Sequence, residues 1–314
     1  MEYYLQMLFG CQICQYAMSF SRPGLRIISS SQIKYNMPSP AIVKRLRVSS
    51  RSYSTVLKTP NPIPSAFIRG GTSKGVFINR KYLPENQEEW AIIFQGILGS
   101  PDPIHRRQLN GMGGGISSLS KIVVVGPPKS ATDPSKVDCE YTFVQVGVED
   151  GAIDMAGNCG NLSSMVGCFA IEEGICSARI ENGRGRVRSW NINTKKQIDT
   201  VFPVSIGTQG SSVRPVLDLE EISIAGVPGK ASRIDLEFTN PAGARTGRLL
   251  PTGRPVDVLN LPGNSLTEVS LVDATNPTVI VPYHEVRSVH LRVVFSYIIT
   301  HSPVAHFAGF GAIS

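Results

Sequence analysis

The fold depends most on residues 157–174, which read Gly-Asn-Cys-Gly-Asn-Leu-Ser-Ser-Met-Val-Gly-Cys-Phe-Ala-Ile-Glu-Glu-Gly. Four apolar side chains of this segment share the i, i+3, i+4, i+7 spacing of one helix face: Leu162, Met165, Val166 and Phe169. Gly174 is the kind of residue that ends a helix. We therefore predict a central, buried helix from Asn158 to Gly174.

Most segments around this helix have the β-branched or alternating pattern of strands. The expected strands are 66–69, 76–78, 118–125, 141–148, 187–192, 198–204, 234–238, 256–259, 268–272 and 278–281. A second helix is predicted from Glu88 to Leu98, ending before Gly99. The sequence therefore predicts an α+β fold in which sheet wraps around a central helix.

Residues 1–60 form a basic leader. They carry eight of the 31 basic side chains and one of the 24 acids, which accounts for the whole net charge of +7. A segment rich in Arg and Ser and almost free of acids is typical of a mitochondrial transit peptide. We therefore expect localisation in the mitochondrial matrix, with a disordered extension on a cytoplasmic protein as the alternative.

The rest of the chain is electrically balanced, since basic and acidic side chains are equally numerous after residue 60. No basic stripe with interleaved aromatics remains there to follow a phosphate backbone. No stretch reaches the roughly 18 apolar residues expected of a membrane span. We expect no nucleic-acid partner and no membrane partner.

The first glycine-rich cluster is residues 69–75, Arg-Gly-Gly-Thr-Ser-Lys-Gly. Its glycines let backbone N–H groups approach an anion, while Thr72, Ser73 and the flanking cations add donors and charge. Lys74 is followed by Gly75, so the cluster is not a Walker loop. On physical grounds alone, this cluster can be either a tight hairpin turn or a loop that binds an anion.

The second cluster is residues 110–121, Asn-Gly-Met-Gly-Gly-Gly-Ile-Ser-Ser-Leu-Ser-Lys. It lacks the third glycine of a dinucleotide fingerprint, and its Ser-x-x-Lys run leads into a strand where a serine acyltransferase needs a helix. Lys121 opens onto the apolar run 122–125, so its ammonium is expected to be partly desolvated, which lowers a lysine pKa. The alternative is a strand-end lysine in solvent.

The third cluster is residues 157–161, Gly-Asn-Cys-Gly-Asn, at the start of the predicted central helix. A thiol in this place feels the positive end of the helix dipole and unpaired N–H groups, which favour the thiolate. The same N–H groups can bind a carboxylate or a developing enolate. We therefore expect Cys159 to be functional and Cys168, within the helix, to be an inert core residue.

Together these clusters resemble the 2-methylaconitate cis-trans isomerase (PrpF) family, which includes 3-methylitaconate Δ-isomerase, aconitate isomerases and 4-oxalomesaconate tautomerase. Further matching motifs are Gly-Ser-Pro-Asp-Pro at 99–103, Pro-Thr-Gly at 251–253 and Asn-Pro-Thr at 276–278. The resemblance runs from about Ile63 to Val286.

The resemblance implies a diaminopimelate epimerase-like fold, with two similar domains that each wrap sheet around a central helix. It implies a small polycarboxylate substrate, no metal and no organic cofactor, and an acid/base pair at Lys121 and Cys159, either of which can be the base. Candidate substrate-binding residues come from the matched motifs: Arg69, Gly70, Gly71, Thr72, Ser73, Lys74, Met112, Ser117, Ser118, Asn158, Gly160, Asn161, Thr252 and Thr278.

The expected domains are residues 63–205 and 206–314. We expect the domain at 206–314 to be incomplete, with an atypical tail from about residue 287 and without a second central helix or a late Gly-His-Pro-Ser-Gly motif. We therefore expect slow turnover and self-association, for example as a homodimer.

Three functions remain open at this point. The first is an isomerase of methylaconitate-, aconitate- or methylitaconate-type acids. The second is a catalytically impaired relative that binds polycarboxylates or self-associates. The third is an amino-acid epimerase of the same fold, which would need two facing cysteines where the sequence offers Cys159 alone.

Overall fold

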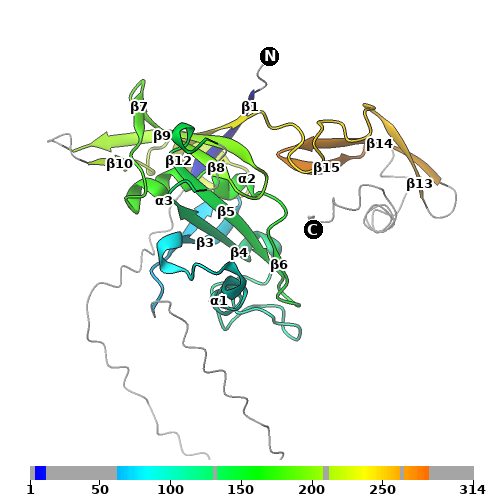
Figure 1. Ribbon diagram of the computed structural model, residues 1–314, viewed down its shortest axis with the longest axis horizontal. Helices are drawn as coiled ribbons and strands as arrows, with labels where there is room; N and C mark the ends of the chain where they lie inside the picture. Colours follow the sequence, from blue (N-terminus) through cyan, green and yellow to red (C-terminus); the bar gives the residue numbers. More distant parts are fainter. Residues whose placement is uncertain (1–3, 12–61, 130–132, 208–211, 262–264, 283–314) are drawn as a thin grey trace, which may run out of the picture.

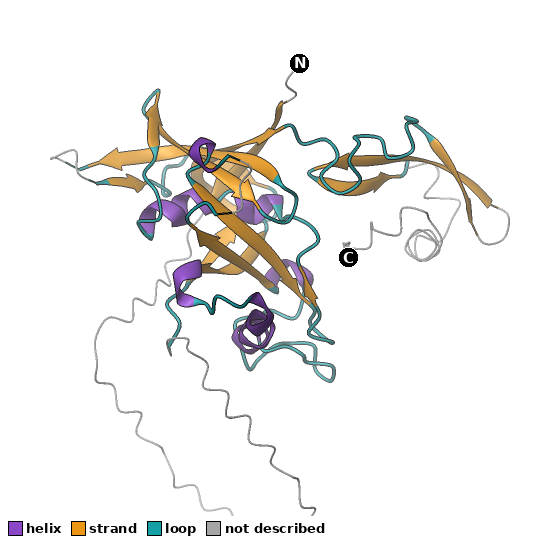
Figure 2. Ribbon diagram, viewed as in Figure 1, coloured by secondary structure: helices purple, strands orange, loops and turns teal. Residues whose placement is uncertain are grey.

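The computed structural model describes residues 4–11, 62–129, 133–207, 212–261 and 265–282. Strands dominate this part of the chain, and its helices are few and short (Figure 2). The strands form a large sheet of 12 strands and a small sheet of three strands, which lies to one side of the large one (Figure 1). The sheet-dominated α+β class that the sequence predicts is therefore confirmed.

Eight strands form the continuous path of the large sheet, in the order β1-β12-β9-β8-β5-β4-β3-β2. Their bounds are β1 (Tyr4–Cys11), β2 (Ala66–Gly70), β3 (Ser73–Asn79), β4 (Lys121–Gly126), β5 (Cys139–Val146), β8 (Arg184–Asn191), β9 (Lys196–Ile206) and β12 (Val227–Thr239). Four short strands pair at the margins: β6 (Ile153–Asp154), β7 (Arg179–Glu181), β10 (Val213–Pro215) and β11 (Ile222–Ile224).

Neighbouring strands of the path pair antiparallel, except that β3 with β4 and β5 with β8 are parallel. Parallel strands need a crossover connection, and both crossovers here contain helices. The first is α1 (Trp90–Leu98), and the second contains α2 (Gly160–Ser163) and α3 (Val166–Glu172). Gly99 ends α1 with a left-handed φ of 76°, at the residue where the sequence predicts the end of this helix.

Short 3₁₀ turns complete the described structure: Arg80–Tyr82, Gln87–Glu89, Ser117–Leu119 and Pro134–Lys136. The strand predicted from residue 118 therefore begins at Lys121, after one of these turns. None of the helices in the described ranges is both long enough and apolar enough to cross a membrane.

The large sheet curves around α2 and α3. The longer of these helices, α3, packs against β4, β5, β8 and β9, and the two edge strands β1 and β2 also approach each other. The inner face of the sheet and the two helices share one apolar core, which includes Phe77, Tyr141, Met165, Phe202 and Phe238. A helical segment therefore lies at the centre of the sheet, where the sequence predicts one.

The opposite, outer face of the sheet carries a second core. Alternate residues of a strand point to opposite faces, so Val76 and Val124 face outward while their neighbours Phe77 and Val123 face inward. The outward residues pack against α1, whose buried members include Trp90 and two further large apolar side chains, Phe94 and Leu98. Residues of β3 and β4 therefore contribute to both cores.

The central helix differs from the single helix predicted over residues 158–174, because it is broken between α2 and α3. At the break, the hydroxyls of Ser163 and Ser164 donate to the carbonyls of Cys159 and Asn161 at 2.9 and 2.7 Å. Serine hydroxyls that bond to carbonyls three or four residues earlier compete with the helix backbone and bend it. The apolar spacing predicts the buried face but does not reveal this break.

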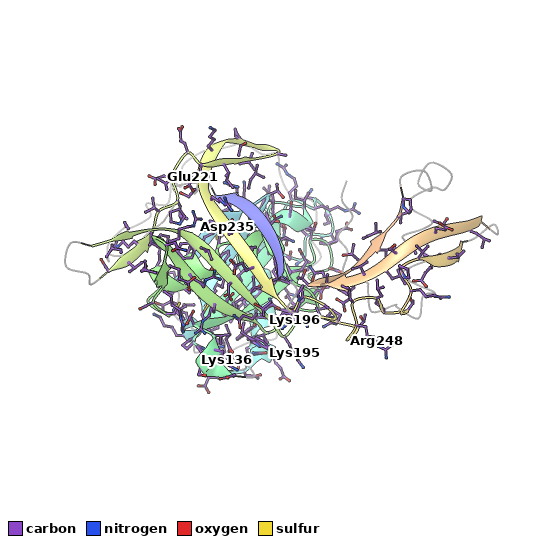
Figure 3. All side chains as sticks on the ribbon, turned by 90° about the horizontal axis from the view of Figure 1, so that it is seen from above. Lys136, Lys195, Lys196, Glu221, Asp235 and Arg248 are labelled. Carbon is purple, nitrogen blue, oxygen red and sulfur yellow. The ribbon has the colours of Figure 1, made fainter. Side chains whose placement is uncertain are left out.

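The small sheet is an antiparallel meander of β13 (Asp257–Leu261), β14 (Ser265–Ala274) and β15 (Asn276–Ile280). These three strands overlap the strands predicted at residues 256–259, 268–272 and 278–281. Lys196 lies at the junction between the two sheets (Figure 3), where its ammonium donates to the carbonyl of Ala242 at 2.7 Å.

Parts of the predicted leader and of the predicted second domain form strands of the large sheet. Residues 4–11 of the leader form β1, which pairs with β12 along its whole length. Strands β10 to β12 belong to the large sheet, so the boundary predicted between residues 205 and 206 falls inside that sheet. Residues 12–61 and the tail from about residue 287 lie outside the described residues.

Candidate active site

Lys121 is the first residue of β4, and only 9% of its surface is exposed. The alternation of β4 turns its side chain to the inner face, which it shares with Val123. Its ammonium donates to Gln145 Oε1 and lies 5.4 Å from the centre of the Phe143 ring. Burial lowers the pKa of Lys121, and the charge of Cys159 partly offsets this effect. Lys121 is therefore desolvated, as the sequence predicts, and is not a strand-end lysine in solvent.

Cys159 immediately precedes α2 on the same inner side of the sheet. Its sulfur lies 3.9 Å from Ser73 Oγ on β3, and its half-buried side chain packs against the inner core. Two residues further along β3, Gly75 lies so close to Lys121 that an added Cβ would be 3.0 Å from the Lys121 carbonyl oxygen. The structure therefore brings both residues of the expected acid/base pair to the strand β3, on one face of the sheet.

The helix that follows Cys159 is shorter than the sequence predicts, since α2 has four residues. The dipole at a helix end is the sum of aligned peptide dipoles, so a helix of one turn has little of it. The argument that a long helix favours the Cys159 thiolate is therefore wrong in that form.

The first glycine-rich cluster forms the tight turn between β2 and β3. Gly71 has a left-handed φ of 53°, and a Cβ on Gly70 would lie 2.3 Å from the Asn161 carbonyl oxygen. The Asn161 amide donates to Thr72 Oγ1 at 3.1 Å and to Ser73 Oγ at 3.2 Å. The hairpin-turn interpretation is therefore confirmed, and the turn is held against α2 beside the candidate cysteine.

Asn158 is the buried centre of a hydrogen-bond network. Its Oδ1 accepts from the Tyr141 hydroxyl at 3.0 Å and from Asn191 Nδ2 at 3.1 Å, and Ser163 Oγ lies 3.1 Å from the same oxygen. Burial raises the pKa of Tyr141, which keeps its hydroxyl protonated as a donor. The backbone of Asn158 also exchanges two hydrogen bonds with the Asn276 side chain, at 2.9 and 2.8 Å. The residue before the candidate cysteine is thus fixed by both sheets.

Ser117 and Ser118 lie in the 3₁₀ turn directly before Lys121. The Gln145 amide nitrogen donates to the carbonyls of Ser117 and Ser120, at 3.2 and 2.9 Å. Sequence reasoning did not single out Gln145. It lies in the strand predicted at 141–148, but its place opposite Lys121 depends on a strand register that the sequence does not reveal.

Two further residues fix the loop between α1 and this turn: Gln108, which the sequence did not single out, and Asp102, which belongs to the motif at residues 99–103. Gln108 accepts from the Gly115 N–H at 3.0 Å and donates to Ser120 Oγ at 2.8 Å. The Asp102 carboxylate accepts backbone N–H groups, above all that of Arg107, and these bonds lower its pKa to about 2. The second glycine-rich cluster is therefore an ordered loop that ends at the candidate lysine.

Arg69 and Lys74 face the other side of the sheet. They are paired across β2 and β3, and strand alternation places them with Phe67 and Val76, which belong to the outer core. Arg69 Nη1 donates to the Gly71 carbonyl at 2.6 Å. These two cations therefore lie on the face opposite to the candidate lysine, and their predicted part in substrate binding stays a prediction.

The remaining candidate substrate-binding residues lie in four different parts of the fold. Gly160 is the first residue of α2, and Met112 is exposed in the glycine-rich loop. Thr278 donates to the Asn276 carbonyl at 3.3 Å, next to the contact between the sheets. Thr252 bonds within the region of the small sheet, donating to Asp257 Oδ2 at 2.7 Å. Among the described residues, no group of three or more His, Cys, Asp or Glu side chains could hold a metal ion.

Fold and site define a class of protein: a sheet-dominated α+β protein with a buried lysine and a cysteine on one face, beside a turn rich in hydroxyls. A comparison with protein families matches residues 61–290 to the family described as PrpF protein. The chain belongs to this family. The match includes all three glycine-rich clusters and every described strand except β1.

Individual relatives agree with this assignment. The chain is 38% identical over 225 residues to the 3-methylitaconate isomerase of Eubacterium barkeri, covering 72% of this chain and 55% of that protein. It is 36% identical over 229 residues to the 2-methyl-aconitate isomerase of Shewanella oneidensis, covering 70% of this chain and 54% of that protein. The chain thus spans about half the length of the curated relatives it matches.

A solved structure is also similar. The crystal structure of methylitaconate-delta-isomerase superimposes with a TM-score of 0.55 at 36% sequence identity, covering 72% of this chain and 54% of that chain. This similarity supports the same sheet-dominated fold.

Proposed function

We propose that the chain isomerises a small unsaturated di- or tricarboxylic acid, with Lys121 and Cys159 as its acid/base pair and without a cofactor. Relatives named as isomerases of 3-methylitaconate and 2-methylaconitate support the substrate class. A further relative, from Novosphingobium, is named (4E)-oxalomesaconate Delta-isomerase.

The observation that carries the proposal is the position of Lys121. Its ammonium is buried on the inner face, burial lowers its pKa, and a negative charge on Cys159 opposes this lowering. An acid/base catalyst works best when its pKa lies near the working pH, and burial moves a lysine in that direction. A lysine that served only solubility would not be placed here.

The chemistry requires one proton to leave a carbon and one proton to return to the carbon skeleton. One group of the pair removes a proton from a carbon that is allylic to the double bond and activated by a carboxylate. The electron pair of the broken C–H bond enters the conjugated system and forms an enolate-like anion. If the other group then protonates the distant carbon, the double bond moves and the pair exchanges protonation states. If the anion first rotates about the former double bond and the carbon that lost the proton is protonated again, the double bond keeps its position and changes its geometry.

The turn between β2 and β3 supplies groups that suit substrate carboxylates. Thr72 and Ser73 present hydroxyls there, and Asn161 binds both of them. Ser117 and Ser118 lie in the turn before Lys121. Neutral donors of this kind hold a carboxylate without the desolvation penalty of a buried cation.

Two broader proposals follow from the same resemblance. The curvature of the large sheet around α2 and α3 supports a diaminopimelate epimerase-like domain, with the small sheet as part of a second domain of this type. The composition of residues 1–60 supports import into the mitochondrial matrix.

The function is tested by incubating the chain with trans-aconitate, 2-methylaconitate and 3-methylitaconate in D₂O and following their olefinic signals by NMR. We expect one acid to change its double-bond position or geometry and to take up deuterium at the carbon that receives the proton. Heat-denatured protein serves as the control. If all three acids stay unchanged and free of deuterium, the proposed function is wrong.

A further inference from the structure

Gln145 lies directly opposite Lys121 in the antiparallel pair of β4 and β5. Its side chain is on the inner face, because Phe143, two residues before it, belongs to the inner core. Directly opposed residues of an antiparallel pair have Cβ atoms roughly 5 Å apart, so their side chains are close enough to interact. Lys121 and Gln145 do so through a hydrogen bond from the ammonium to the amide oxygen.

The orientation of the Gln145 amide is fixed by its surroundings. Its nitrogen is close to three carbonyl oxygens, those of Ser120 at 2.9 Å, Ser117 at 3.2 Å and, more weakly, Val146 at 3.5 Å. A carbonyl oxygen only accepts hydrogen bonds, so the amide end that faces these groups must be the NH₂ donor. The oxygen of the same amide must therefore face Lys121.

We propose that Gln145 is a positioning residue for Lys121, which orients the amine toward a substrate and holds the Ser117–Ser120 turn in place with the same amide. This inference rests on the proposed function. The Gln145 amide links Lys121, the candidate acid or base, to the turn whose serines would donate hydrogen bonds to a substrate carboxylate. The turn and the amine would therefore face one substrate in a fixed relation.

The proposal predicts how replacement of the amide changes Lys121. The amide oxygen stabilises the charged ammonium at a site where burial opposes the charge. Of the described residues, Cys159 is the titratable group whose charge acts on Lys121, and Phe143 contributes its ring face. A change at Gln145 leaves both of these in place, so its effect on Lys121 can be measured separately.

The test uses Gln145→Met and Gln145→Glu, with Gln95→Met as the matched control. Gln95 is an amide on α1 that donates to the Gly151 carbonyl at 2.8 Å, on the outer side of the sheet. The readout is the pKa of Lys121, from an NMR titration of protein with ¹³C-labelled lysine, assigned by the signal that Lys121→Met lacks. This readout does not require turnover.

We expect Gln145→Met to lower the pKa of Lys121 by about one pH unit, because a hydrogen bond to a charged group is lost. Gln145→Glu should raise this pKa, because it places a carboxylate beside the ammonium. Gln95→Met should leave it unchanged. In active protein, the limb of the kcat–pH profile that belongs to Lys121 should move in the same directions.

An unchanged Lys121 pKa in both Gln145 variants would overturn the proposal, even if both variants lost activity. If Gln145→Met does not fold, the upward shift in Gln145→Glu decides alone. Absence of turnover in the unmodified chain would count against the proposed function. The Lys121 titration would still decide whether Gln145 controls this amine.

Discussion

The environment of Lys121 determines what its amine can do. A lysine in water is protonated at neutral pH and is a poor base, whereas a buried one loses part of the solvation that favours its charge. Here the ammonium keeps one strong acceptor, Gln145, and one aromatic face, Phe143. Burial and these two contacts therefore act on the charge of this amine in opposite directions.

The state of Cys159 can be tested directly by alkylation. Limiting iodoacetamide at neutral pH should modify Cys159 before Cys139 and Cys168, because the latter two are buried and Cys159 is partly accessible. A hydrogen bond with Cys176, together with burial, raises the pKa of Cys139 and protects it further. Mass mapping of the modified peptides measures the order. Labelling of the buried Cys139, or of Cys176, which is partly accessible like Cys159, ahead of Cys159 would contradict this prediction.

The burial of Lys121 also predicts a dependence of stability on pH. Its pKa in the folded protein is below the 10.5 of an ordinary lysine. Between these two values the unfolded chain binds more protons, so the free energy of unfolding rises with pH across this interval. Lys121→Met removes this effect, and its stability relative to the unmodified chain should fall as the pH rises.

Urea unfolding at about pH 7 and about pH 10 measures this difference. The matched substitution is Lys136→Met, at a lysine whose side chain is 75% exposed, and it should show no such trend. A Lys121→Met effect of the same size at both pH values would contradict the burial argument.

At the scale of elements, the sequence predicts most of what the structure contains. Apolar spacing locates α1 with its end at Gly99, and strand patterns overlap the other seven strands of the large sheet's path and the three strands of the small sheet. They miss β1, which lies in the predicted leader, and the short marginal strands β6, β7, β10 and β11. The sequence does not locate the break after Ser163, because local serine hydrogen bonds cause this break and leave the apolar spacing intact. It also misses Gln145, since a partner across strands is fixed by tertiary register.

The contact between the β2–β3 turn and α2 gives a test at this scale. A Cβ at Gly70 would meet the Asn161 carbonyl at 2.3 Å and Ser164 Oγ at 3.0 Å, so Gly70→Ala must push the turn away from the helix. We expect it to lower the free energy of unfolding by about 1–3 kcal/mol. The same substitution at Gly96, within α1, meets nothing within 4 Å and should stabilise by about 0.5–1 kcal/mol.

Urea unfolding of the two variants checks this pair of opposite effects. Equal stabilities for Gly70→Ala and Gly96→Ala would show that the turn does not need to approach α2. Labelling of Cys159 provides a second readout, because a displaced turn moves Ser73 away from its sulfur.

At the scale of the whole molecule, the two sheets meet at the candidate site. Asn276, the first residue of β15, exchanges two hydrogen bonds with the backbone of Asn158, the residue before Cys159. Lys196, on β9, also donates to the carbonyl of Ala242, which forms an isolated bridge with Ala274 of β14. Sequence patterns identify each sheet, but they do not reveal this junction, because it joins residues 118 positions apart in the chain.

The charge of the molecule is also distributed unevenly. The net charge of +7 comes from residues 1–60, and the rest of the chain is balanced. The charge around the candidate site therefore comes from local groups such as Lys121, and not from an excess of cations in the rest of the chain.

The measurement that tests the central claim most directly is deuterium uptake by an unsaturated tricarboxylic acid with the unmodified chain, Lys121→Met and Cys159→Ser. If these residues are the two halves of one acid/base pair, each variant should isomerise at least about 100-fold more slowly. The variant that keeps the base should still exchange the activated C–H with D₂O. Isomerisation at the unmodified rate in either variant would contradict the account.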